Sequence, residues 1–131
     1  QPAGPIIILT TSEKTAACTR ENVSVDRVAD NNGQVDLYQA LNWLAEQKQV
    51  NELHVEAGSI LCGALLESDL VDEVVIYMAP HIMGDSAKGL FHLPQIASMN
   101  QRIGLDILDM RALGKDWRIT ARPRRRIIEE L

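Results

Sequence analysis

One stretch decides the fold of this chain, and it reads Leu53-His54-Val55-Glu56-Ala57-Gly58-Ser59-Ile60-Leu61-Cys62. Its first half has the composition of a short buried strand that ends at Glu56. A turn through Gly58 then leads into a helix that begins at Ser59. The first N–H groups of a helix have no partner within it, and that end carries a partial charge of about +0.5, so phosphate groups bind there. We therefore interpret the stretch as a candidate nucleotide-binding turn.

Two roles are open for the residues of this turn. In an open α/β sheet, ligands bind beyond the carboxyl ends of the strands, where Glu56 would hold a sugar hydroxyl or another donor beside the phosphate. In the alternative, Glu56 only caps the following helix and Gly58 only eases a tight turn. A short turn with one glycine does not separate the two. Gly63 costs the predicted helix about 1 kcal/mol relative to alanine, which indicates close approach by a backbone or a ligand.

The sequence before and after this stretch alternates strands and helices. The apolar, β-branched run at 6–11 is typical of a strand buried on both faces, and such a strand needs neighbours. Strand–helix–strand order implies right-handed crossovers and a parallel sheet. The predicted elements are strands at 6–11, 23–28, 52–56 and 71–79, a turn at 30–33, a helix capped by Asp36 and ended by Asn51, and a helix at 59–68. The predicted packing stripes are Leu37, Ala40, Leu41, Leu44 and Lys48 on the first helix, and Ile60, Leu61, Ala64 and Leu65 on the second.

The pattern changes after Pro80. Residues 80–100 show no periodicity and predict a long connection, whereas 105–111 and 116–121 alternate around Gly114-Lys115 as in a half-exposed hairpin. We predict an α/β fold with a mostly parallel mixed sheet, flanked by helices and closed by this antiparallel hairpin. The predicted domain covers 1–121, and 122–131 form an Arg-rich tail.

Composition limits the class of protein. The 131 residues suit one globular domain, and the net charge of -5 argues against a nucleic-acid partner. No apolar run reaches the length of a membrane span. Cys18 and Cys62 are the two cysteines, and we expect a reduced, cytoplasmic chain. The histidines lack ligand spacing, so we expect no metal site. His81 follows a strand, but a lone histidine is more often a surface residue, and we assign no catalytic residue.

Residues 53–90 resemble a known family. The run LHVEAGSILCGALLESDLVDEV (53–74) and the run IYMAPHIMGDSAKGL (76–90) are similar to the reductase domain of RibD, the bifunctional riboflavin-biosynthesis enzyme. The similarity is strong over about residues 50–93, and the flanks agree in pattern only. The usual turn of the family has two glycines, whereas Ala57 stands here before Gly58.

The resemblance implies a dihydrofolate-reductase-like fold and a reaction. The family uses NADPH to reduce 5-amino-6-(5-phosphoribosylamino)uracil to the ribitylamino product. By resemblance, Glu56 contacts the substrate. The implied cofactor-binding residues are Gly58, Ser59, Ile60, Leu61, Cys62, Gly63 and Ala64.

The resemblance also implies partners and alternatives. The family domain normally begins upstream of residue 1 and is fused to a zinc deaminase domain that has no counterpart here. We therefore expect the C-terminal part of a reductase domain, incomplete at its N-terminus, inactive alone and working as a homo-oligomer. The alternatives are a non-catalytic assembly or dimerisation module, and a related dihydrofolate-type reductase that acts on another pterin or pyrimidine.

Overall fold

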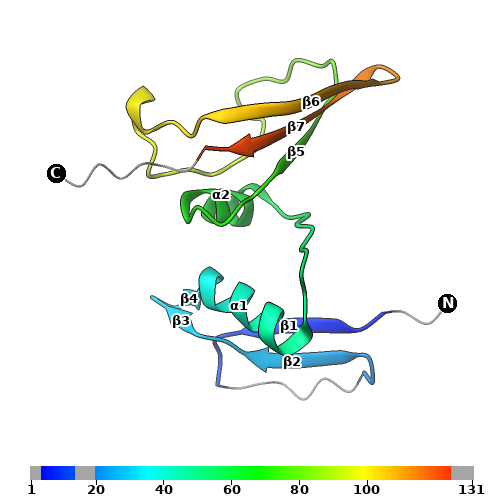
Figure 1. The fold of residues 1–131 in the computed structure, drawn as a ribbon. Coiled ribbons are helices and arrows are strands. Elements are labelled where there is room, and N and C mark those ends of the chain that lie inside the picture. Colours follow the sequence, from blue (N-terminus) through cyan, green and yellow to red (C-terminus); the bar gives the residue numbers. More distant parts are fainter. Residues whose placement is uncertain (1–3, 14–19, 125–131) are drawn as a thin grey trace. The chain divides into compact units, whose positions relative to one another are not determined.

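The computed structural model describes residues 4–13 and 20–124, whose helices and strands are labelled in Figure 1. The chain divides into two units, Gln1–His54 and Val55–Leu131, and each is described by itself. Residues 1–3, 14–19 and 125–131 lie outside the described residues, and the last of these ranges includes most of the predicted tail.

The first unit is built on a parallel pair of strands. β1 (Ile6–Thr10) pairs with β2 (Val23–Arg27), which confirms both strands. The prediction that β1 is buried on both faces is wrong, because Ile6 and Ile8 are each 46% exposed. Among the described strands, β2 is the one neighbour of β1, so the pair leaves much of its apolar surface uncovered.

A tight hairpin and a capped helix follow. β3 (Asp30–Asn31) and β4 (Gln34–Val35) pair around Asn32-Gly33, and both turn residues have positive φ, as the predicted turn chemistry requires. α1 (Leu37–Lys48) has Asp36 as its N-cap, as predicted, and the carboxylate accepts the N–H of Gln39 at 2.9 Å. The helix ends before the predicted Asn51.

The predicted packing stripe of α1 is only partly confirmed. Ala40 is buried, whereas Lys48 is exposed and its ammonium lies 5.1 Å from the centre of the Trp43 ring. The long lysine side chain lies over an aromatic face instead of joining a core.

The second unit contains one helix and an antiparallel sheet. α2 (Ser59–Glu67) begins at the predicted residue, β5 (Val74–Met78) follows it, and the long connection contains the short 3-10 helix η1 (Met99–Gln101). β6 (Leu105–Leu113) and β7 (Asp116–Pro123) form the predicted hairpin around Gly114-Lys115. The sheet order is β5-β7-β6, and β7 runs past the predicted domain boundary at 121.

The predicted mostly parallel mixed sheet is not confirmed. The described strands pair as one parallel pair, one two-stranded hairpin and one three-stranded antiparallel sheet. Residues 52–58 form no strand, so the predicted strand at 52–56 is wrong in this structure. Leu53 and Val55 are 49% and 39% exposed, and no described strand pairs with them. A strand requires a hydrogen-bonded neighbouring strand, and among the described strands none pairs with this segment.

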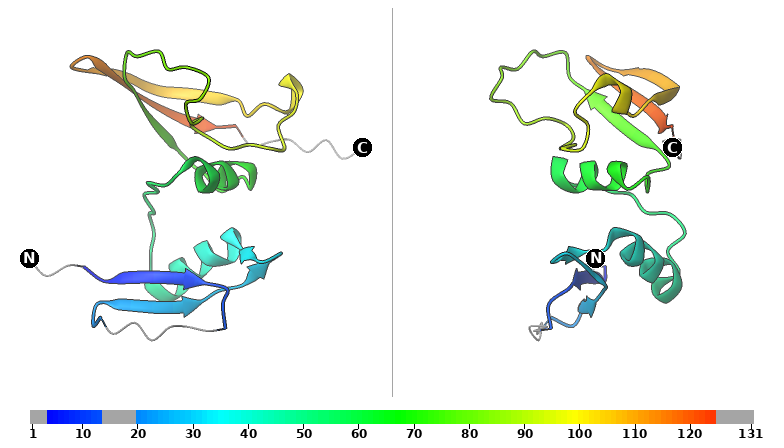
Figure 2. Two further views of the ribbon diagram at one scale, coloured as in Figure 1. Left: turned by 180° about the vertical axis from the view of Figure 1, so that it is seen from behind. Right: turned by 90° about the vertical axis from the view of Figure 1, so that its left-hand side faces the viewer.

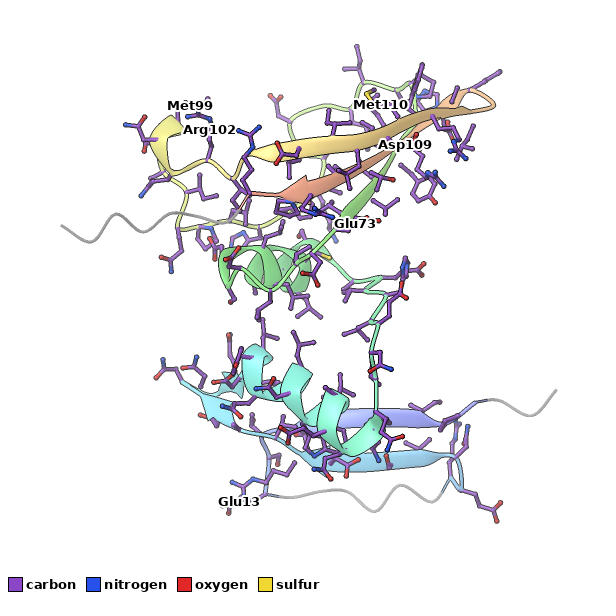
Figure 3. The ribbon with its side chains drawn as sticks, viewed as in Figure 1. Glu13, Glu73, Met99, Arg102, Asp109 and Met110 are labelled. Atoms are coloured by element: carbon purple, nitrogen blue, oxygen red, sulfur yellow. The ribbon has the colours of Figure 1, made fainter. Side chains whose placement is uncertain are left out.

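A β-bulge gives the sheet one apolar face. Ile107 pairs with Ala121 and Asp109 with Thr120, so Leu108 is an extra residue in β6. The bulge restores the alternation, because Ile107 and Met110 then share a face although they are three residues apart. Figure 3 labels Asp109 and Met110, neighbours whose side chains belong to opposite faces of β6.

The core of this unit lies where α2 and the sheet lie side by side, as Figure 1 and both views of Figure 2 show. Ala121 of β7 is fully buried, and Leu65 and Leu66 of α2 are 7% and 8% exposed. The predicted α2 stripe is wrong in part, because Ile60 is 72% exposed. Residues 60–66 are nearly all apolar, so periodicity does not select the buried face.

The end of the hairpin carries a pH-sensitive ion pair. The Arg124 Nε–H donates to Asp106 Oδ1 at 2.7 Å, and this hydrogen bond holds the pKa of Asp106 below its ordinary value. The contribution of the carboxylate to stability is therefore fully present above the unfolded-state pKa of about 3.9 and is lost as the pH falls through the folded-state pKa.

We predict that Asp106→Asn lowers the free energy of unfolding slightly at neutral pH, and that its difference from wild type disappears towards about pH 2. Denaturant titrations at several pH values measure this difference. Arg124→Gln should lose the same acid-sensitive contribution. A difference that does not change with pH would show that the ion pair contributes nothing through titration.

Candidate functional site

The first turn of α2 is open. Gly58 is the N-cap with φ -74° and ψ 169°, an extended conformation that any residue adopts, and no side chain caps the helix. A Cβ built on Gly58 meets nothing within 4 Å. The N-cap position is thus occupied by Gly58 and not by Glu56, and the backbone of the turn does not itself require a glycine. A binding role for Glu56 and Gly58 stays a prediction.

The peptide groups of this turn can bind an anion. The Cys62 N–H donates to Gly58 O at 3.1 Å, which is the first backbone hydrogen bond of the helix. The N–H groups of Ser59, Ile60 and Leu61 precede it and point out of the helix end. Ile60 and Leu61 are 72% and 42% exposed, so apolar side chains do not bury this end. Together with the helix dipole, these donors favour a phosphate.

Glu56 lies two residues before the N-cap, in the segment 52–58, which is neither helix nor strand, and it is exposed. Glu56, Gly58 and Ser59 are close in sequence and all belong to the second unit. His81 is exposed in the connection after β5, where its N–H donates to Ala79 O at 2.8 Å.

Cys62 faces back towards the turn. Its free thiol is half-buried and donates to Ala57 O at 3.5 Å, across the start of the helix. Cys62 therefore contributes to the shape of the turn through its hydrogen bond to the Ala57 carbonyl. Cys18 lies outside the described residues.

Gly63 is used for packing against backbone. A Cβ at this position would lie 2.0 Å from His92 O and 2.8 Å from His92 C, so a side chain of any size is excluded. The prediction of a close approach at Gly63 is confirmed, and the approaching group is the peptide of His92. A direct role of Gly63 and Ala64 in binding a cofactor stays a prediction.

Sequence reasoning missed the residues that approach α2. The segment 91–96 lies in the long connection, which has no periodicity to define it. Gly63 inside an apolar helix was the one signal of a contact there, and it did not identify the partner. Within the described residues, no group of three or more His, Cys, Asp and Glu side chains could hold a metal ion, and no helix is long and apolar enough to cross a membrane.

Most of the sequence matches a known protein family. The family model described as RibD C-terminal domain covers residues 2–119, and the chain belongs to this family. This confirms the resemblance found at residues 53–90.

Individual proteins of known name and structure are also similar to this chain. RibD of Haemophilus influenzae is 37% identical over 78 residues, which cover 60% of this chain and 21% of that protein. The 5-amino-6-(5-phosphoribosylamino)uracil reductase of Buchnera aphidicola is 33% identical over 96 residues, covering 73% of this chain and 46% of that protein. The structure of RibD from Acinetobacter baumannii has a TM-score of 0.71 at 26% identity, covering 91% of this chain and 37% of that one. The chain therefore spans less than half the length of these relatives.

We predict that Gly63→Ala destabilises the protein by about 1–3 kcal/mol, because overpacking against a backbone costs more than the gain in helix propensity. Gly84→Ala is the matched control, since a Cβ there meets nothing within 4 Å, and its effect should stay within about 0.5 kcal/mol. Urea unfolding of both variants measures the difference. A Gly63→Ala variant as stable as wild type would contradict the close contact.

Proposed function

We propose that this chain is part of an NADPH-dependent reductase of riboflavin biosynthesis, acting on 5-amino-6-(5-phosphoribosylamino)uracil. Membership of the RibD C-terminal domain family and the reductase name of the Buchnera aphidicola relative support this activity. Because the chain spans at most 46% of the relatives described above, the activity is proposed for the full-length gene product. We propose little or no turnover by the 131 residues alone.

The observation that carries the proposal is the open first turn of α2. Three N–H groups, those of Ser59, Ile60 and Leu61, precede the first hydrogen bond of the helix, and no side chain caps them. Gly58 leaves free space in front of them. These donors fit the phosphate groups of NADPH, which carry negative charge and accept several hydrogen bonds.

In the proposed reaction, the cofactor supplies the chemistry and the protein binds and orients it. When bound, NADPH would supply the hydride that reduces the ribosyl group. The residues of the α2 first turn would fix its phosphates, which orients the nicotinamide ring without taking part in the chemistry. The cytoplasmic location remains part of the proposal.

Glu56 is the proposed substrate contact. It lies two residues before the N-cap and is exposed, so its carboxylate can accept hydrogen bonds from hydroxyl groups of a sugar beside the cofactor.

We predict that Gly58→Val raises the Kd for NADPH at least tenfold in the full-length gene product, because the branched side chain fills the space of the phosphate. A tenfold change corresponds to about 1.4 kcal/mol. Gly84→Val is the matched control, since both glycines have no atom within 4 Å of a built Cβ. Isothermal titration calorimetry gives the Kd, and thermal unfolding verifies that both variants fold.

NADPH binding, together with the oligomeric state, distinguishes the proposed reductase from a non-catalytic assembly module. β5 and β6 each have one described strand neighbour, so either outer edge of the sheet could pair with a second copy. A stable dimer in sedimentation experiments, with no NADPH binding by the wild-type protein, would favour the module. Equal NADPH affinity in wild type and Gly58→Val would refute the proposed cofactor site.

A further inference from the structure

The first turn of α2 is held weakly by its own side chains. Ile60 is 72% exposed and Leu61 is 42% exposed, whereas the buried residues of the helix, Gly63, Leu65 and Leu66, lie in later turns. Burial of apolar side chains is the usual anchor of a short helix. Another contact must therefore fix the turn that carries the proposed phosphate donors.

Residues 91–96, which we name the strap, supply such contacts at both ends of the helix. The His92 N–H donates to Ser59 O at 3.0 Å, and Ser59 is the first residue of α2. The Gln95 N–H donates to Glu67 Oε1 at 3.0 Å, and Glu67 is the last residue. Two main-chain donors of one segment thus reach the beginning and the end of a nine-residue helix.

Gly63 lets the strap lie directly on the helix between these two bonds. The His92 peptide occupies the space of a Cβ, with its oxygen 2.0 Å from that position. Packing of backbone on backbone leaves no side chain to yield, so a shift of the strap moves the helix with it.

The strap is also stiff by its local chemistry. The Ile96 N–H donates to Leu93 O at 3.1 Å, which closes a turn with Pro94 at its second position. Proline fixes φ near -65° and favours this turn. The two contacts of the strap are therefore connected by a segment with few alternative conformations.

We propose that the strap fixes the first turn of α2 for cofactor binding, and that Gly63 and Glu67 are positioning residues that act through it. The effect on affinity rests on the proposed function. If the cofactor binds mainly when the strap is docked, its apparent Kd rises as the docked fraction falls. By linkage, NADPH must then stabilise the docked strap by the same factor.

Glu67 offers a test that does not alter the backbone. Glu67→Met removes the acceptor for the Gln95 N–H while keeping a similar length, and Glu67→Gln keeps a side-chain oxygen at the same position. Amide hydrogen exchange by NMR in the full-length gene product would follow three amides: those of Gln95, His92 and Cys62. The Cys62 amide reports on the first turn, because it makes the first hydrogen bond of the helix.

We expect Glu67→Met to speed the exchange of all three amides severalfold and to raise the Kd for NADPH about three- to tenfold. Glu67→Gln should stay close to wild type in both measurements. In the wild-type protein, NADPH should slow the exchange of the His92 amide. The melting temperatures of Glu67→Met and Glu67→Gln, measured in parallel, should agree. Equal melting temperatures would exclude a general loss of stability as the cause of the faster exchange.

Faster exchange at Gln95 alone, with His92 and Cys62 unchanged, would overturn the strap, since the two contacts would then be independent. An unchanged Kd in Glu67→Met would overturn its positioning role. No binding of NADPH by the wild-type protein would instead refute the proposed function and the effect on affinity, while the exchange data would still decide whether the strap fixes the first turn.

Discussion

The close approach of the His92 peptide to Gly63 is the contact on which the second unit depends. It places the long connection between β5 and β6 against α2, and it requires a helix residue without a Cβ. Glycine within a helix costs about 1 kcal/mol relative to alanine. Here that cost is offset by main-chain packing and by hydrogen bonds that reach the first and last residues of the helix. The exposed first turn of α2 thereby receives a fixed position without a covering side chain.

The three-stranded sheet separates apolar residues on one face from charged residues on the other. Arg111 and Arg118 pair across β6 and β7, and like charges in this position repel each other. Asp109 lies between them, with its Oδ2 3.1 Å from Arg118 Nη2 and 3.6 Å from Arg111 Nη2. Asp109 and Arg111 share a face because they are two residues apart, and the bulge at Leu108 brings Ile107 onto the opposite, apolar face with Met110.

Features with local causes could be predicted from the sequence. The cap at Asp36, the Asn32-Gly33 turn and the start of α2 after Gly58 each depend on a few adjacent residues. The strand at 52–56 could not be predicted correctly, because a strand depends on neighbours that its own composition does not specify. The strap was missed for a related reason. Its bonds use main-chain N–H groups, which every residue except proline possesses, so the sequence of 91–96 does not mark them.

The bulge at Leu108 has a genetic consequence. Loss of this single codon would leave composition, charge and overall hydropathy almost unchanged. Because Ile107 pairs with Ala121 and Asp109 with Thr120, the shortened strand would keep both pairs in a regular ladder, and Asp106 and Ile107 would stay on their faces. An in-frame deletion of one residue at the bulge should therefore be less harmful than the same deletion in β7, which has no extra residue and would turn part of its side chains to the opposite face.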